Sequence, residues 1–168
     1  MALWKHAHGL DLNFHVSLPE SKSISREVTL DHDTTDERYL GAVLHLLMEK
    51  ATHELRKTKR KAKTVTVRIR YSDFRKISRA GTLEKATNLD EVIYRKAIEL
   101  LQQGRHRRVR VRLIGIHLSH FEPETGQYEL FPDAGEDRAR NLYEKVDGVR
   151  DRFGFESLQT GQSIFLGK

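Results

Sequence analysis

The sequence predicts an α+β domain in which two helices cover one face of a four-stranded antiparallel sheet. Four segments alternate apolar and polar residues with the period of two that is typical of strands. Two further segments repeat apolar residues at helical spacing, which gives the order β-α-β-β-α-β. With this order, packing both helices on one sheet face is the economical way to bury every apolar side.

The first two elements are a strand and a helix. Residues 21–31 alternate and are rich in β-forming residues, and their core-facing positions are Ile24, Val28 and Leu30. Arg26 shares this parity and interrupts the apolar pattern. Residues 33–37 combine capping residues with acids, which predicts a helix start. The apolar positions of that helix are Leu40, Val43, Leu44, Leu47, Ala51 and Leu55. We expect the helix to end in the basic run 56–61.

Two strands joined by a short turn are expected next. The alternation is clearest over 64–71, where one side carries Val65, Val67, Ile69 and Tyr71 and the other carries Thr66, Arg68 and Arg70. Ser72 and Asp73 can turn the chain, and a second strand then runs from Phe74 to Leu83.

A second helix and a fourth strand complete the pattern. Thr87 or Asn88 can cap this helix, and Gly104 can end it. Its apolar positions are Leu89, Ile93, Ala97, Leu100 and Leu101. The last strand is expected over 107–121, and its apolar residues change parity near Gly115, which predicts a bulge or bend at that glycine.

The composition changes after residue 121. Residues 122–126 form an acidic linker with proline and glycine, and a helix is predicted from about 136 to 153. One stripe of this helix is apolar and consists of Leu142, Val146, Val149 and Phe153. The sequence therefore divides into an N-terminal segment at 1–20, a main domain at 21–121 and a tail at 122–168.

Charge is distributed unevenly along the chain. Residues 1–20 have a net charge of −1, residues 21–121 carry 23 bases and 12 acids for a net +11, and residues 122–168 have −4. A basic middle favours a polyanionic partner, although surplus lysine and arginine can also serve solubility alone. The chain has no cysteine, which excludes disulfides and thiolate metal sites, and no run approaches the roughly 20 apolar residues of a membrane span. We expect a cytoplasmic protein.

Basic residues recur on one side of the predicted sheet. Arg68, Arg70, Arg110 and Arg112 alternate outward on two strands, Arg79 lies on a third, and Lys22 and Ser23 lie on the fourth. Guanidinium and hydroxyl groups on a flat sheet can contact phosphates without reading bases. The alternative is a solvated face whose charges prevent edge aggregation. We predict a phosphate-contacting surface on this side of the sheet.

Five segments carry a resemblance to a known family. In order, they are Lys22–Leu30, Glu54–Lys57, Val67–Phe74, Ile77–Leu83 and Val111–Ile116. Together they resemble the little finger domain of Y-family (translesion) DNA polymerases, in particular the bacterial DNA polymerase IV branch. The resemblance covers residues 21–121 and implies the same β-α-β-β-α-β sheet.

The resemblance also implies a role for this sheet. It would lie along duplex DNA and hold the template and primer backbones, and the matching positions are Ser23, Ser25, Arg26, Ser78, Arg79 and Thr82. Many relatives have a second arginine where this chain has Gly81, so contact through that strand is expected to be weaker. His117 and His120 are expected on or beside the DNA face. The parent protein would be a magnesium-dependent polymerase that copies damaged templates.

A short peptide follows the main domain. Residues 127–131, Gln-Tyr-Glu-Leu-Phe, match the Gln-x-x-Leu-Phe pattern of peptides that bind the bacterial sliding clamp. Gln127 would set the orientation, while Leu130 and Phe131 would fill an apolar cleft of the clamp. Alternatively, the Leu-Phe pair covers the edge of the chain's own core. We predict that the peptide binds the clamp.

Neither a catalytic nor a metal site is expected in this chain. The close histidine pairs, His6 with His8 and His117 with His120, lack a third ligand at suitable spacing. The family's metal-binding carboxylates lie in a palm domain, which no segment here resembles, so no cofactor is assigned to the chain itself. Residues 3–11 resemble the end of the family's thumb domain, and residues 13–20 would be the tether that follows it. The chain is therefore expected to begin within a longer protein.

Two alternatives of other classes stay open. One is an RNA-binding module of split βαβ type, although such modules usually stack bases on aromatic side chains of the sheet. The outward positions predicted here are arginine and threonine. The other is a stand-alone adaptor that binds nucleic acid or the clamp.

Overall fold

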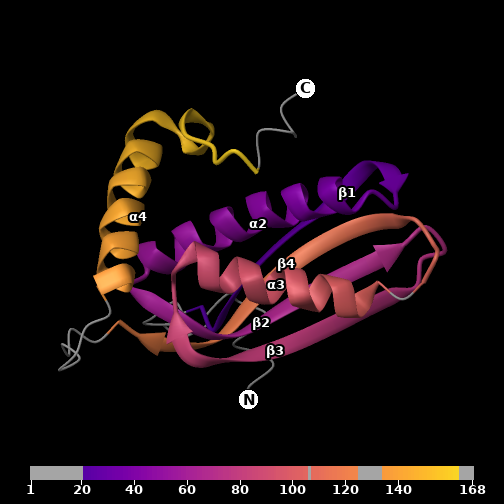
Figure 1. Ribbon diagram of the computed structural model, residues 1–168, viewed down its shortest axis with the longest axis horizontal. Helices are drawn as coiled ribbons and strands as arrows, with labels where there is room; N and C mark the ends of the chain where they lie inside the picture. Colours follow the sequence, from indigo (N-terminus) through magenta and orange to yellow (C-terminus); the bar gives the residue numbers. More distant parts are fainter. Residues whose placement is uncertain (1–20, 106, 125–133, 163–168) are drawn as a thin grey trace, which may run out of the picture.

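The computed structural model describes residues 21–105, 107–124 and 134–162. Its elements are β1 (Ser23–Thr34), α2 (Glu37–Lys57), β2 (Arg60–Tyr71), β3 (Lys76–Thr87), α3 (Asp90–Gly104), β4 (Val111–Pro123), α4 (Ala134–Phe153) and a short 3-10 helix, η1 (Phe155–Ser157). The strands form one antiparallel sheet in the order β1-β4-β2-β3. Helices α2 and α3 lie on one face of the sheet, and α4 stands at the end of the sheet where α2 ends (Figure 1). The predicted α+β fold is confirmed.

Helix α2 and the central strands supply most of the core. Asp36 caps α2, because its carboxylate accepts hydrogen bonds from the backbone N–H groups of Arg38 and Tyr39 at 2.9 and 3.3 Å. The apolar positions predicted for α2 and for the core side of β2 are all buried. Tyr71 is fully buried, and its hydroxyl donates to the Gly104 carbonyl at 2.8 Å. This bond ties the end of β2 to the end of α3.

Several predicted boundaries differ from the structure. Helix α2 ends at Lys57 and the chain turns into β2 at Arg60, so the basic run is only partly helical. Phe74 lies in the β2–β3 turn, where its φ is 64°, and not in a strand. Leu89 is buried as predicted, but it is itself the N-cap of α3, so the predicted cap at Thr87 or Asn88 is wrong. Thr87 nevertheless accepts a hydrogen bond from the Leu89 backbone N–H at 3.2 Å.

The helix-facing side of β1 is only partly covered. Ile24 and Leu30 are 3% and 6% exposed, but Val28 is 38% exposed, so its predicted burial is wrong. Strand β1 is an edge of the sheet, and its middle residues line an open groove beside α2. A side chain with helix-facing parity at an edge can therefore remain in contact with water.

The bulge in β4 was predicted at Gly115, but it lies at Arg112. Strand β4 begins at Val111, and the register pairs Arg70 with Leu113 but Tyr71 with Val111, which leaves Arg112 as the extra residue. Gly115 stays in unbroken register with both neighbouring strands. Its lack of a side chain serves close approach instead, because a Cβ at this position would lie 2.7 Å from the Glu27 Cβ atom. In the described part of the chain, every helix is too short or too polar to cross a membrane.

Candidate nucleic-acid interface

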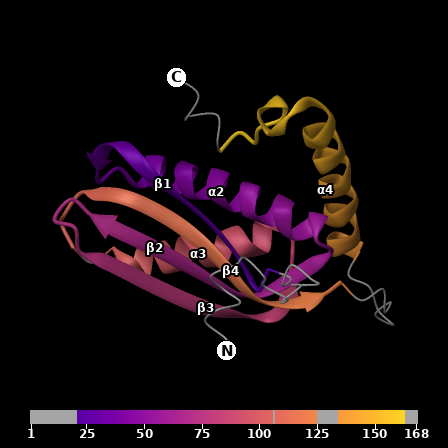
Figure 2. The same ribbon diagram turned by 180° about the vertical axis from the view of Figure 1, so that it is seen from behind.

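The candidate binding surface is the exposed face of the sheet, opposite α2 and α3. Figure 2 shows the sheet in front of α3, with no described element across the near face. In the strand order β1, β4, β2, β3, the register gives four rows on this face: Ser23, Ser119, Thr64, Thr82; Ser25, His117, Thr66, Ala80; Glu27, Gly115, Arg68, Ser78; and Thr29, Leu113, Arg70, Lys76. We call these residues the open face. The alternate positions point to the helices, as period-two geometry requires.

The open face has two chemically different ends. The row farthest from the β2–β3 turn consists only of serine and threonine, and the next row holds Ser25 and Thr66. The cations of the open face, Arg68, Arg70 and Lys76, lie toward the β2–β3 turn. Glu27 is the acid in these rows, and no position in them is Phe, Tyr or Trp. Short hydroxyl side chains allow a ligand to approach the sheet closely, and both hydroxyl and guanidinium groups donate to phosphate oxygens.

The structure confirms part of the predicted outward set and extends it. Ser23, Ser25, Arg68, Arg70, Ser78 and Thr82 all lie on the open face. Lys22 is exposed and directly precedes β1. Sequence reasoning missed Lys76, whose position follows from its pairing with Arg70 across β2 and β3. Pairing is not visible in one strand alone.

Two predicted arginines lie on the other side of the sheet. Arg79 pairs with Val67, a buried core residue, and therefore points toward α3, so its predicted outward placement is wrong. Arg26 pairs with Ile116, which is also buried, and its guanidinium forms an ion pair with Glu54 of α2. Neither side chain can join the open face without a change in strand register.

Arg110 and Arg112 lie at the cationic end but not in regular alternation. Arg110 precedes β4 and is exposed, and its carbonyl accepts a hydrogen bond from the Ser72 N–H at 2.9 Å. Arg112 is the bulged residue, and its guanidinium lies 5.0 Å from the ring centroid of Phe74, which is 64% exposed. The β2–β3 turn and the start of β4 thus meet in one basic surface beside Arg70.

His117 lies in the middle of the open face, between Ser25 and Thr66. Burial lowers the pKa of His117 below its usual value, and the charge of Arg68 lowers it further, so the ring is neutral at pH 7. Its Nδ1 atom and the Nε atom of Arg70 are buried without a hydrogen-bond partner among the described residues. His120, in contrast, is exposed near the end of β4 with a φ of 55°.

The predicted clamp peptide cannot be placed. Gln127, Leu130 and Phe131 lie outside the described residues, so their predicted role stays a prediction. The backbone before the peptide is held, because the Glu124 N–H donates to the Lys59 carbonyl at 2.9 Å. Within residues 21–105, 107–124 and 134–162, no group of three His, Cys, Asp or Glu side chains is arranged to hold a metal ion.

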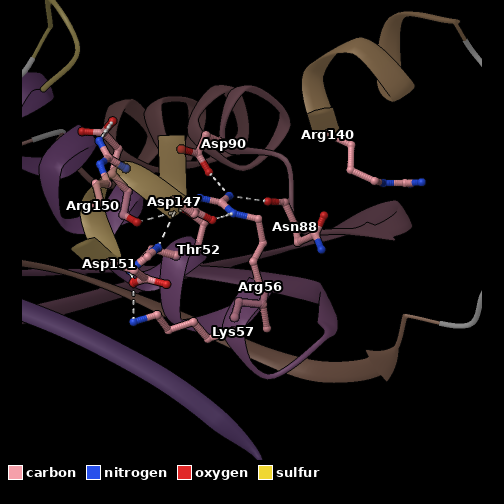
Figure 3. Close-up of polar contacts among 12 residues, drawn as sticks. Thr52, Arg56, Lys57, Asn88, Asp90, Arg140, Asp147, Arg150 and Asp151 are labelled. Atoms are coloured by element: carbon pink, nitrogen blue, oxygen red, sulfur yellow. Dashed lines mark hydrogen bonds and ion pairs between the residues drawn. The ribbon is translucent and has the colours of Figure 1, made fainter. Parts of the chain in front are cut away.

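Helix α4 docks on the domain through charged side chains (Figure 3). The Arg56 guanidinium donates to both carboxylate oxygens of Asp147, at 2.6 and 3.0 Å, and to Asp90 at 2.6 Å. Arg150 donates to Glu49 at 2.9 Å, and this pair is almost completely buried. Paired ions of this kind hold α4 against α2 and the start of α3.

Further contacts surround these two ion pairs. The ring nitrogens of His53 lie 3.0 Å from Asp147 and 3.1 Å from Asp151, and Lys57 lies 2.6 Å from Asp151. Burial alone would raise the pKa of Glu49, but hydrogen bonds with His45 and Arg150 lower it below its usual value. The Glu49 carboxylate therefore stays charged opposite Arg150.

A known protein family matches most of this chain. The description "impB/mucB/samB family C-terminal domain" applies to residues 21–130, which is most of the chain. The chain belongs to this family. The match confirms the predicted resemblance to the C-terminal, little finger domain of Y-family DNA polymerases.

Curated relatives of this Y-family domain are named DNA polymerase IV. One from Dehalococcoides mccartyi (strain CBDB1) is 36% identical over 95% of this chain and 41% of its own length. Another, from Clostridium kluyveri, is 31% identical over 96% of this chain and 43% of its own length. The chain thus spans about two fifths of the length of these relatives.

Solved Y-family structures share the fold. A DinB family error-prone DNA polymerase from Sulfolobus solfataricus matches with a TM-score of 0.50 and 26% identity over 70% of this chain and 34% of that one. An insertion ternary complex of Dbh DNA polymerase matches with a TM-score of 0.52 and 23% identity, over 73% of this chain and 35% of that one. A little finger domain of PolIV in complex with the beta-clamp matches with a TM-score of 0.51 and 19% identity, over 67% of this chain and 98% of that one.

Proposed function

We propose that this chain is the little finger portion of a translesion DNA polymerase, that it holds duplex DNA by the phosphates, and that it contributes no catalytic residue. The observation that carries the proposal is the open face, where hydroxyl groups and cations share one flat surface. Such a surface fits phosphate backbones and offers little that selects a base. The buried Nε atom of Arg70 has no hydrogen-bond partner among the described residues, and a phosphate oxygen could accept its hydrogen bond, which supports the proposal.

The relatives support the assignment of the parent protein. They are named DNA polymerase IV, and one chain of the same fold is described as an insertion ternary complex of a DNA polymerase. Since this chain spans about two fifths of the relatives, the proposal assigns the polymerase active site and its magnesium to the remainder of the parent protein. A location in the bacterial cytoplasm follows from the same proposal.

The proposal further assigns recruitment to the sliding clamp to Gln127, Leu130 and Phe131. A PolIV little finger domain of the same fold is described in complex with the beta-clamp. At 19% identity this likeness concerns the fold, so the assignment rests on the pattern of the peptide itself. A glutamine followed by a leucine-phenylalanine pair supplies one orienting polar group and two apolar anchors.

Binding to duplex DNA across a salt series tests the phosphate grip. The affinity should fall steeply with salt, because each phosphate contact releases counterions. Replacing Arg68 and Arg70 together by alanine should reduce the slope of log K against log salt by about 2 and weaken unrelated sequences equally. The matched control replaces Arg38 and Arg95, two exposed bases of α2 and α3, and should leave the slope unchanged.

Three outcomes of this experiment would contradict the proposal. They are an affinity that does not change with salt, a strong preference for one sequence, and a preference for single-stranded RNA over duplex DNA. The last outcome would favour an RNA-binding module, which usually uses sheet aromatics that the open face lacks. Nucleotide incorporation by the pure chain would contradict the non-catalytic assignment.

A further inference from the structure

Helix α4 exposes three residues of its apolar stripe, while Val146 in the middle of the stripe is half-buried. Leu142 is 59% exposed, Val149 is 37% exposed and Phe153 is 66% exposed. The charged face of the same helix, with Asp147 and Arg150, makes the contacts with α2. Large apolar side chains that gather on one exposed helix face commonly mark an interaction surface.

The spacing of the stripe is that of a coiled-coil seam. Its residues are Ala139, Leu142, Val146, Val149 and Phe153, which alternate steps of three and four and so occupy the a and d positions of two heptads. At the helical rise per residue this seam is about 21 Å long. A seam of this length fits one partner helix that lies along α4.

The charges beside the seam restrict the kind of helix that fits. One flank carries Arg138, Lys145 and Arg152, which occupy successive g positions, and all three are exposed. None of these bases forms an ion pair with a described residue, although Arg152 lies over the Phe153 ring at 5.3 Å. The opposite flank is already used, since Arg150 pairs with Glu49.

A second copy of this chain is a poor occupant for the seam. In a pair of α4 helices, the basic flank of one copy would face basic residues of the other copy, which is repulsive. A partner helix with acidic residues beside its own apolar seam would instead form ion pairs along the whole flank. Charge complementarity therefore selects a different protein.

We propose that the apolar stripe of α4 binds one amphipathic helix of a partner protein, and that this helix carries acidic residues beside its apolar seam. The docked, charged face of α4 stays on the domain while the neighbouring apolar stripe receives the partner. The proposal is independent of the DNA grip and of the clamp peptide, because it uses neither the open face nor residues 127–131.

Two synthetic helical peptides with the same leucine seam test this proposal, one with glutamate and the other with lysine at the flanking positions. Fluorescence anisotropy with the full chain at low salt should show at least about tenfold tighter binding of the glutamate peptide. Replacing Leu142 and Phe153 together by serine should abolish this binding. Both side chains are largely exposed, so circular dichroism should show an unchanged helix content.

Two further variants sharpen the test. Reversing Arg138, Lys145 and Arg152 to glutamate should exchange the preference, so that the lysine peptide binds more tightly. The matched control Val92→Ser removes an exposed apolar side chain of α3 and should change nothing. Equal binding of the two peptides, no binding of the glutamate peptide, or a dimer in sedimentation that Leu142→Ser dissolves would each overturn the proposal.

Discussion

Arg56 joins three elements at the C-terminal end of α2, which makes it the sharpest test of how α4 is held. Its side chain is 9% exposed and donates to Asp147, to Asp90 and to the Asn88 carbonyl. The substitution Arg56→Met keeps most of the apolar stem and removes every one of these donors. The side chain of Asp90, which is 8% exposed, would then lack its countercharge.

The cost of this change follows from the burial of Asp90. Removing one partner of a buried ion pair typically costs about 3–5 kcal/mol, because the other charge remains uncompensated. We expect Arg56→Met to lower the free energy of unfolding in urea at pH 7 by this amount. The double variant Arg56→Met with Asp90→Asn should recover about half of the loss, since a neutral amide is cheaper to bury.

The pH dependence provides a second check. Burial raises the pKa of Asp90, and the charge of Arg56 opposes this rise, so the pKa should be higher still in Arg56→Met. An acid whose pKa is higher in the folded state stabilises the fold at low pH and loses that contribution as pH rises through the folded pKa. The deficit of Arg56→Met should therefore be smaller near pH 4 than near pH 7.

A matched control uses an exposed ion pair. Arg95 pairs with Glu91 at 2.8 Å on the surface of α3, where both side chains are at least 75% exposed. Arg95→Met should cost less than about 0.5 kcal/mol, as is usual for exposed pairs. The reasoning is refuted if Arg56→Met costs no more than this control, or if Asp90→Asn brings no recovery.

Three further predictions address the open face and the peptide. Gly115→Ala should lower the free energy of unfolding by about 1–3 kcal/mol, because the new Cβ would lie 2.7 Å from the neighbouring strand. As a control on α4, Gly148→Ala meets no atom within 4 Å and should raise the free energy of unfolding by up to about 1 kcal/mol. Urea unfolding measures both changes. Burial lowers the pKa of His117 below 6.5, so the fold should lose stability as pH falls below that value, and His117→Gln should lose less; identical pH profiles in thermal unfolding would contradict this placement. Leu130→Ala with Phe131→Ala should abolish measurable clamp binding, since lost anchors typically cost about 2 kcal/mol or more, while DNA affinity measured on the same preparation should not change.

Local patterns in the sequence predicted the helices and strands well, because each element buries one apolar face and that face is visible in the spacing of its own residues. The helical spacing of α2 and the alternation of β2 are strong, and the structure confirms both. Arg79 shows how a prediction can overlook a signal that was present. Ile77 and Leu83 share its parity, and Leu83 is buried, so the apolar neighbours indicated the helix-facing side of β3.

Features that depend on distant residues could not be predicted in this way. The bulge at Arg112 exists only relative to the pairing of β4 with β2. The orientation of α4 is another example, since its apolar stripe was recognised but the face that docks is decided by pairs such as Arg56 with Asp147. Buried ion pairs are weak as a source of net stability but strong in selecting one geometry, because a misplaced helix would leave each charge unpaired.

This choice of geometry bears on how the proposed functions combine. The peptide at 127–131 lies between β4, which is fixed in the sheet, and α4, which is fixed by its ion pairs. We propose that this domain holds DNA, and a peptide joined to the domain at both ends would then belong to the same complex. Occupation of one site would raise the effective concentration at the other. If the proposed functions hold, the ion pairs of α4 also fix the second attachment point of the peptide and leave the apolar seam exposed for the proposed partner helix.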